Sequence, residues 1–112
     1  MKFTAREREG VTILDLKGKI TIGAGDVELR NAVHQALEGG AKKILINLKD
    51  VSTIDSSGVG ELVSTYTTVT NRSGKLKLEN LPPKVSDILQ ITQLITVFET
   101  FDDEDEAIWS YR

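Results

Sequence analysis

The sequence predicts a single α/β domain, residues 1–112, in which a mixed, mostly parallel central β-sheet of about five strands is combined with about four helices. Short runs rich in β-branched and aliphatic residues, at 11–16 and 43–48, have the composition of strands. Segments whose apolar residues recur at helical spacing, at 29–37 and 57–73, alternate with those runs. Because strands that alternate with helices form mostly parallel sheets, the predicted order of elements is ββαβαβαβα.

The N-terminal part is predicted to form a hairpin and then a helix. Lys2–Arg8 alternates weakly between polar and apolar residues, and residues 11–16 have the alternation of a strand that turns one face to the core. Gly10 lies between them, at the expected turn. Asp26 is expected to cap the following helix, because its carboxylate can accept hydrogen bonds from free backbone N–H groups. Glycines 39–40 are expected to end that helix.

The middle of the chain is predicted to form a central strand and a longer helix. Residues 43–48 are a nearly continuous apolar run, which is typical of a strand covered on both faces. The helix at 57–73 has its apolar residues on one stripe, and Gly74 follows its end.

The C-terminal part is predicted to alternate strands and short helices. Lys75–Glu79 is a candidate strand, and prolines 82–83 fit the first turn of a short helix. Residues 95–101 are expected to form an edge strand. The acidic run 102–106 is expected to be a solvated cap of a terminal helix, in which Trp109 is a packing anchor.

The composition argues against several classes of protein. The chain has 14 basic and 17 acidic residues, and the basic ones are scattered, whereas nucleic-acid binders usually gather them on one face. It has no cysteine and one histidine, His34, so thiolate and histidine-rich metal sites are excluded. No cofactor motif is present. No segment approaches the roughly 20 apolar residues that span a bilayer, and we expect a cytoplasmic protein without a membrane partner.

One segment, residues 46–60, runs from the central strand through a loop to the start of a helix. Ser56 and Ser57 lie at the expected helix N-terminus, where each hydroxyl could act as the cap. The free N–H groups and the helix dipole there tolerate an anionic phosphate. Gly58 and Gly60 would let another protein's backbone approach closely. By themselves these few residues fit a simple cap followed by tight helix packing better than a functional site, because the pattern Asp-Ser-Ser-Gly is short and common.

The longer run 46–60 resembles the signature of bacterial anti-sigma-factor antagonists, the STAS domain family. In that family a hydrophobic strand ends in Asn-Leu, and an acidic loop leads into Asp-Ser-Ser/Thr-Gly-Leu-Gly. The matching residues are Asn47, Leu48, Asp50, Asp55, Ser56, Ser57, Gly58 and Gly60, and Val59 replaces the usual leucine. The resemblance implies that Ser56, which directly follows the aspartate, is the phosphoacceptor, with Ser57 the less favoured choice.

One other segment departs from the family pattern. Family members often have Gly-x-Leu/Ile-Asp after the second strand, and here Thr21 stands in place of that aspartate. The glycine-rich loop 21–25 is expected to lie near the phosphorylation site. The resemblance therefore places partner binding at Thr21, Gly23, Asp55, Ser57, Gly58, Val59, Gly60 and Glu61.

The resemblance also implies a mechanism of partner switching. The unphosphorylated protein would bind an anti-sigma factor that is also a serine kinase, and would thereby free the sigma factor. The kinase would then phosphorylate Ser56, and a metal-dependent serine phosphatase would reverse the modification. A phosphate adds about 1.5 to 2 negative charges at neutral pH, which Asp55 and Glu61 would oppose. No catalytic residue or cofactor is expected in this chain.

Two other functions are open to the sequence. An enzyme with Ser56 or Ser57 as nucleophile would need a base within reach, and His34, expected to be a partly exposed surface residue, lies within a predicted helix beside its apolar stripe. A Gly-x-Ser-x-Gly elbow is also missing. A module of the same fold could instead serve as a scaffold or as a transporter-associated subunit, because fold and site do not identify the partner.

Overall fold

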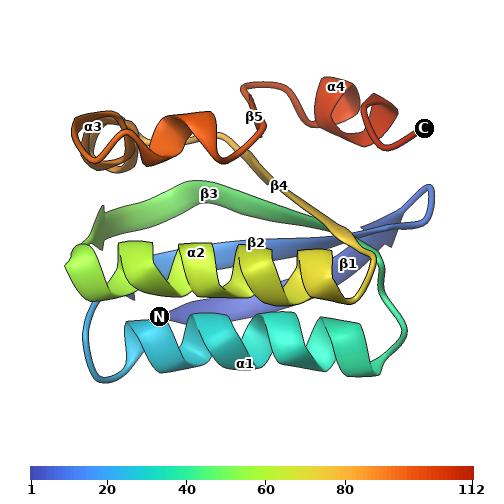
Figure 1. Cartoon of the computed structure of the whole chain (residues 1–112), viewed down its shortest axis with the longest axis horizontal. Coiled ribbons are helices and arrows are strands. Elements are labelled where there is room, and N and C mark those ends of the chain that lie inside the picture. The colour runs from blue at the N-terminus through green and yellow to red at the C-terminus, as the bar shows by residue number, and fades with distance from the viewer.

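A five-stranded sheet with the spatial order β1-β2-β3-β4-β5 forms the centre of the computed structural model, which describes residues 1–112 (Figure 1). The strands are β1 (Lys2–Arg8), β2 (Val11–Ile20), β3 (Lys43–Ile54), β4 (Lys75–Glu79) and β5 (Thr100–Phe101). β1 is antiparallel to β2, and all the other neighbours are parallel. The predicted fold class and order of elements are confirmed.

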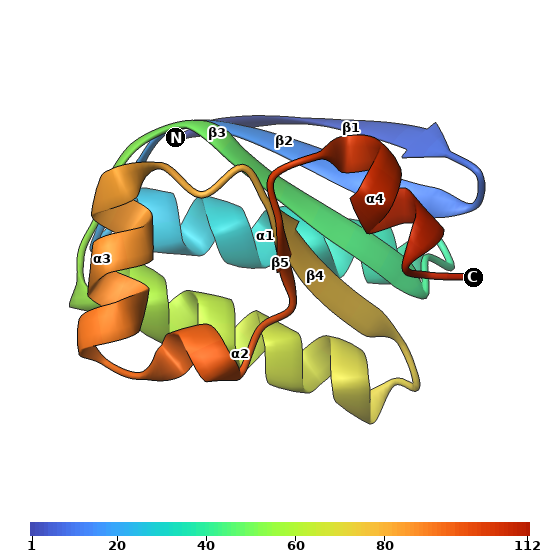
Figure 2. The ribbon, with the colours of Figure 1, turned by 90° about the horizontal axis from the view of Figure 1, so that it is seen from above.

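Helices cover both faces of the sheet. They are α1 (Gly25–Glu38), α2 (Ser56–Asn71), α3 (Pro83–Ile91) and α4 (Glu104–Trp109), with a short 3₁₀ helix, η1 (Leu94–Thr96), after α3. α1 and α2 lie together on one face and α4 lies over the other, while α3 packs its buried Val85 and Leu89 into the same core cluster as α1 and α2 (Figures 1 and 2). None of these helices is long and apolar enough to cross a membrane.

The core is divided by the sheet into two clusters. The larger has 20 buried residues, and the side chains of Leu14 and Ile46 belong to it. The smaller has six, in which Ile13 and Leu45 pack against α4. β3 is therefore covered on both faces, as its apolar run predicted. β2 is also covered on both faces, although its alternation predicted only one buried face. Full burial of one such side chain stabilises the fold by about 1.5–3 kcal/mol.

β3 is longer than predicted, because it continues past Leu48 to Ile54. In this extension Val51 and Ile54 are buried, while polar neighbours remain exposed. The pairing of β2 and β3 continues, through two register shifts, to Ile20 opposite Ile54. The two strands consequently end side by side, and the segments that follow them meet at the same edge of the sheet.

The predicted cap of the first helix is wrong. α1 begins at Gly25, its N-cap residue is Ala24, and no side chain caps it. The Asp26 carboxylate instead accepts a hydrogen bond from the neighbouring N–H of Val27 at 2.8 Å. The expected end is confirmed, since Gly39 is the C-cap and Gly40 has a φ of 93°.

The C-terminal part differs more from the prediction. Residues 95–101 do not form one strand: only Thr100–Phe101 pairs with β4, and η1 occupies part of the remainder. Trp109 is not a packing anchor, because it is 63% exposed. Tyr111 has that role, since it is buried and its hydroxyl donates to the carbonyl oxygen of Ile44. The acidic run is only partly a solvated cap: Asp103 caps α4, but Glu104 is half-buried and forms ion pairs with β1.

Candidate functional site

The loop after β2 and the start of α2 form one continuous site. Ile20 and Ile54 are paired at the carboxyl ends of their strands, and the N–H of Asp55 lies 3.4 Å from the carbonyl oxygen of Ile20. The segment 21–24 and the first turn of α2 therefore begin next to each other. In open α/β sheets this edge is the usual place for binding. The expected proximity of the glycine-rich loop to Ser56 follows from this geometry.

Asp55, and neither of the two serines, caps α2. Its Oδ1 accepts a hydrogen bond from the N–H of Gly58 at 2.9 Å. Its Oδ2 accepts one from the N–H of Ile22 at 3.0 Å, across to the β2–α1 loop. The hydrogen bonds from Gly58 and Ile22 hold the pKa of Asp55 below its ordinary value, so the carboxylate is ionised at neutral pH.

Ser56 and Ser57 differ in their accessibility. Ser56 is the first residue of α2 and is exposed, whereas Ser57 is half-buried. Because Asp55 provides the cap, the Ser56 hydroxyl is not needed to hold the end of the helix. The residue that the family resemblance marks as phosphoacceptor is therefore the more accessible of the two.

The two glycines of the motif occur in different structural surroundings. A Cβ on Gly58 would lie 2.1 Å from the carbonyl oxygen of Ile20 and 2.7 Å from Cγ1 of Ile54, so only glycine allows α2 to approach the strand ends. Gly58 is buried and lies against its own chain. Gly60 is exposed, and a Cβ there would meet nothing within 4 Å. Tight packing thus explains Gly58, but it does not explain Gly60.

Two other residues of the expected partner surface face inward. Val59 is buried in the main cluster. Glu61 is 7% exposed, and its Oε1 accepts hydrogen bonds from Arg30 of α1 at 2.7 and 3.0 Å. This ion pair joins α1 to α2 and compensates the charge of Glu61, which lowers its expected repulsion of a phosphate at Ser56.

The β2–α1 loop contributes a residue that the sequence analysis did not single out. Thr21 is half-buried, and Gly23 is exposed with a φ of 98°, a conformation that favours glycine. Between them Ile22 is 74% exposed, although it is a large apolar side chain. The presence of an isoleucine inside a glycine-rich loop could have pointed to this residue. Its hydrogen bond to Asp55 could not have been predicted, because it is made by the Ile22 backbone and not by its side chain.

The polar side chains near this site are arranged in neither a metal-binding group nor a pair of hydroxyl and base. No group of three or more histidine, cysteine or acidic side chains is arranged to hold a metal ion. The Ser56 and Ser57 hydroxyls make no hydrogen bond to a basic side chain, and His34 is half-buried on α1, as the sequence suggested. The arrangement is that of an exposed hydroxyl on a fixed helix end, next to an apolar side chain and an open glycine.

Comparison with known proteins gives consistent results. The family model for the STAS domain matches residues 2–107. The anti-sigma-B factor antagonist of Bacillus subtilis is 34% identical over 94 residues, which are 84% of each chain. The crystal structure of the Thermotoga maritima protein TM1081 has a TM-score of 0.87 at 26% identity, covering 96% of this chain and 92% of that one. The phosphorylated form of Bacillus SpoIIAA has a TM-score of 0.74 at 24% identity, covering 99% and 100%, and shares the fold.

Proposed function

The chain belongs to the STAS domain family, and we propose that it is an anti-sigma factor antagonist controlled by phosphorylation of Ser56. In the unphosphorylated form it binds an anti-sigma factor that is also a serine kinase, and so frees the sigma factor. The observation that carries the proposal is the exposed Ser56 hydroxyl beside the ionised carboxylate of Asp55. The B. subtilis relative, an anti-sigma-B factor antagonist by name, supports the class of partner.

The surface offered to the partner is small and partly apolar, and the ionised Asp55 lies at its edge. Ser56 and Gly60 are one helical turn apart on the same side of α2, and both are exposed. Ile22 and Gly23 are held next to them by the hydrogen bond from Ile22 to Asp55. We call these four residues the Ser56 surface. A partner can place an apolar pocket over Ile22 and bring its backbone close to Gly60.

A phosphate on Ser56 would change this surface without a compensating charge. It adds about 1.5 to 2 negative charges next to Asp55. One of the N–H groups at the start of the helix, that of Gly58, already donates to Asp55 and is not free to hold the phosphate. The cation of α1, Arg30, is already paired with Glu61 at 2.7 Å. We therefore infer that the phosphate stays exposed and acts at the interface, where like-charge contacts cost several kcal/mol.

The test is phosphotransfer with a purified anti-sigma kinase from the same genome. We expect one added phosphate by intact mass, placed on Ser56 by peptide sequencing, retained in Ser57→Ala and lost in Ser56→Ala. The phosphorylated protein should bind the kinase roughly hundredfold more weakly, as like-charge repulsion at an interface predicts. Ser64→Asp is the matched control, because Ser64 is exposed two turns further along α2.

Three outcomes would contradict the proposal. Phosphate on another residue would show that Ser56 is not the phosphoacceptor. Undiminished binding of the phosphorylated form would show that phosphorylation does not control the partner. No transfer from any such kinase would favour a scaffold or transporter-associated module of the same fold. A metal-dependent serine phosphatase that restores binding by removing the phosphate completes the proposed cycle, in which the chain is an interaction module and not an enzyme.

A further inference from the structure

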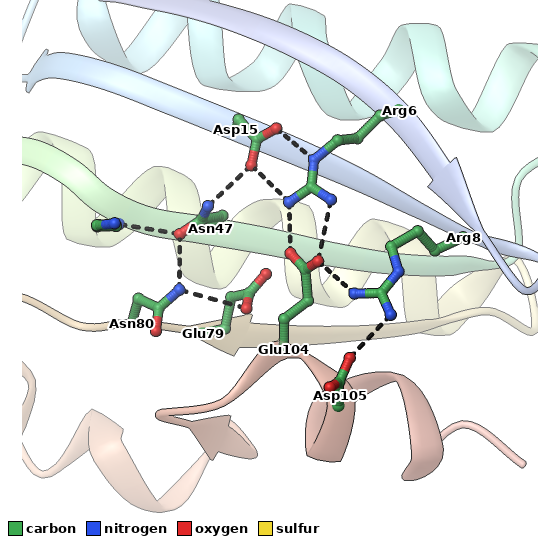
Figure 3. A network of polar contacts seen from close by, with 9 residues as sticks. Arg6, Arg8, Asp15, Asn47, Glu79, Asn80, Glu104 and Asp105 are labelled. Carbon is green, nitrogen blue, oxygen red and sulfur yellow. Dashed lines mark hydrogen bonds and ion pairs between the residues drawn. The ribbon is translucent and has the colours of Figure 1, made fainter.

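A row of polar side chains crosses the face of the sheet opposite to α1 and α2. Asp15 of β2, Asn47 of β3 and Glu79 of β4 are paired neighbours in register, and they point to the same side (Figure 3). The Nδ2 group of Asn47 donates to Asp15 at 2.8 Å. The Nδ2 group of Asn80 donates to Asn47 at 3.1 Å and to Glu79 Oε1 at 3.3 Å. These residues form a continuous network beside α4.

Glu79 is the unusual member of this row. It has no exposed surface, and its Oε2 atom is buried without a hydrogen-bond donor. Its carboxyl group lies against that of Glu104, the first residue of α4 (Figure 3). A buried polar atom without a partner destabilises the fold, and an unpaired buried charge does so more strongly. A protonated Oε2 would remove both costs, because its O–H could donate to the Glu104 carboxylate.

Glu104 has strong reasons to remain ionised. Arg6 donates to its carboxylate through two nitrogens, and Arg8 donates at 2.6 Å. Arg6 also binds Asp15, at 2.6 and 3.1 Å. Hydrogen bonds from Arg6 lower the pKa of Glu104 to about 2. The acid of the pair is consequently Glu79, and the base is Glu104.

No positive charge around Glu79 is left to compensate it when it is ionised. The charged and titratable groups packed around it are Arg6 and Arg8 on β1, Asp15 on β2, Lys77 on β4, Glu99 before β5, and Glu104 and Asp105 on α4. Lys77 pairs with Glu99 at 2.9 Å, and Asp105 is exposed. The two guanidinium groups already pair with three carboxylates, those of Asp15, Glu104 and Asp105. Burial, together with Glu104, raises the pKa of Glu79 to about 8.

We propose that the Glu79–Glu104 carboxyl pair shares one proton and that this proton controls how firmly the C-terminal segment, residues 102–112, is held on the sheet. In the protonated state the Glu79 O–H donates to Glu104 and joins β4 to the first turn of α4. In the ionised state two carboxylates face each other in a buried place, and the contact becomes repulsive. The carboxyl pair lies on the sheet face opposite to α2, and its proposed role is independent of the proposed function of Ser56.

The segment that this pair holds covers part of the core. Beneath it lie Val11, Ile13 and Leu45, all of which are buried. Its other attachments are the hydrogen bond from Tyr111 to the carbonyl of Ile44 and those from Lys77 to Ser110, at 2.9 and 3.0 Å. Burial keeps the pKa of Tyr111 well above its ordinary value, so this phenol stays neutral as Glu79 titrates. α4 has only six residues, so its stability depends on these contacts.

The direction of the pH effect follows from the raised pKa. Below the ordinary carboxyl pKa, Glu79 is protonated whether α4 is attached or detached and adds no slope. In that range the lowered pKa of Glu104 makes attachment weaken as the pH falls, so attachment is strongest near the ordinary carboxyl pKa. Between that value and about 8, only the attached form keeps the proton, so attachment weakens as the pH rises. The limiting slope for one proton is about tenfold in the attachment equilibrium per pH unit. Above about 8 the effect levels off.

The first test is a carboxyl ¹³C NMR titration of the full-length protein, with Glu79 assigned by comparison with Glu79→Gln. We expect the Glu79 resonance to titrate far above the ordinary glutamate value, and the Glu104 resonance below it. An ordinary midpoint for Glu79 would overturn the proposal. This measurement needs no partner and does not depend on whether Ser56 is phosphorylated.

The second test is amide hydrogen exchange of residues 104–112 from about pH 6 to 9, corrected for the intrinsic exchange rate. The protection in the wild type should fall with pH, at up to about tenfold per unit. Glu79→Gln should keep its protection at high pH, because its amide can donate to Glu104 at every pH. Glu38→Gln, at an exposed glutamate of α1, is the matched control and should behave like the wild type. An equal pH slope in Glu79→Gln would show that another group is responsible.

Discussion

The carboxylate of Asp55 accepts a hydrogen bond from the backbone N–H of Ile22 at 3.0 Å, while its other oxygen caps α2 at Gly58. One side chain thus connects the loop that carries an exposed isoleucine to the helix end that carries an exposed serine. The relative position of these two segments does not depend on sheet pairing alone. We infer that Asp55 is the positioning residue of the Ser56 surface.

The two functions of Asp55 should be separable by substitution. In Asp55→Asn the side-chain oxygen can still cap α2, but the new amide nitrogen cannot accept a hydrogen bond from Ile22. We expect a urea midpoint somewhat below that of the wild type, because one hydrogen bond to a charged group is lost within the folded chain. We also expect roughly tenfold weaker binding of the anti-sigma kinase by calorimetry, because the loop is no longer held beside Ser56. Asp55→Ala should lose both stability and binding. Wild-type affinity in Asp55→Asn would show that the link to the loop is not needed.

The two glycines of α2 should respond in opposite ways to alanine. Gly58→Ala places a Cβ 2.1 Å from a carbonyl oxygen, and we expect it to lower the free energy of unfolding by about 2 kcal/mol or more. Gly60→Ala meets open space and should raise that free energy by about 0.5–1 kcal/mol, because alanine is the better helix former. Urea titration measures both.

Gly60→Ala also tests the close approach of a partner. The folded domain does not require a glycine there, so a loss of kinase binding in this stable variant would be an effect at the interface. Unchanged affinity would indicate that the partner leaves space above Gly60.

Ile22→Ser should separate binding from stability. The side chain is 74% exposed, so we expect the free energy of unfolding to change by less than about 0.5 kcal/mol. If Ile22 enters an apolar pocket of the partner, the loss should exceed about 1 kcal/mol of binding energy, or roughly fivefold in affinity. Ile91→Ser is the matched control, since Ile91 is 82% exposed at the end of α3. Equal losses in both variants would indicate a nonspecific effect.

Tyr111→Phe tests the anchoring of the C-terminal segment. It removes the donor to the carbonyl of Ile44 but keeps the buried ring, so we expect a loss of about 1–2 kcal/mol in unfolding free energy. Trp109→Phe serves as the comparison, because the exposed indole should contribute little. A larger loss in Trp109→Phe would reverse the assignment of the anchor.

The order of elements could be read from the sequence because it depends on local patterns. These patterns reflect interactions within a few residues, or burial alone. They are the apolar runs at 11–16 and 43–48, the helical spacing at 29–37 and the glycines near 39. The same holds for the run 46–60, whose residue types pointed to the phosphoacceptor candidate and its family. The predictions that were wrong, such as the strand at 95–101, concern short apolar stretches that fit several secondary structures equally well.

The packing of the sheet decided which atoms meet across the strands. Asp55 caps α2 through a local hydrogen bond from Gly58, but only the pairing of β2 with β3 brings the Ile22 N–H to the other oxygen of the carboxylate. In the sequence Glu79 is an ordinary strand residue, and only the sheet register places it beside Glu104, 25 positions later in the chain. Local chemistry therefore encodes the fold and the motif that contains the exposed serine. The fixed loop and the shared proton depend on distances between remote residues, which are set only when the sheet is packed.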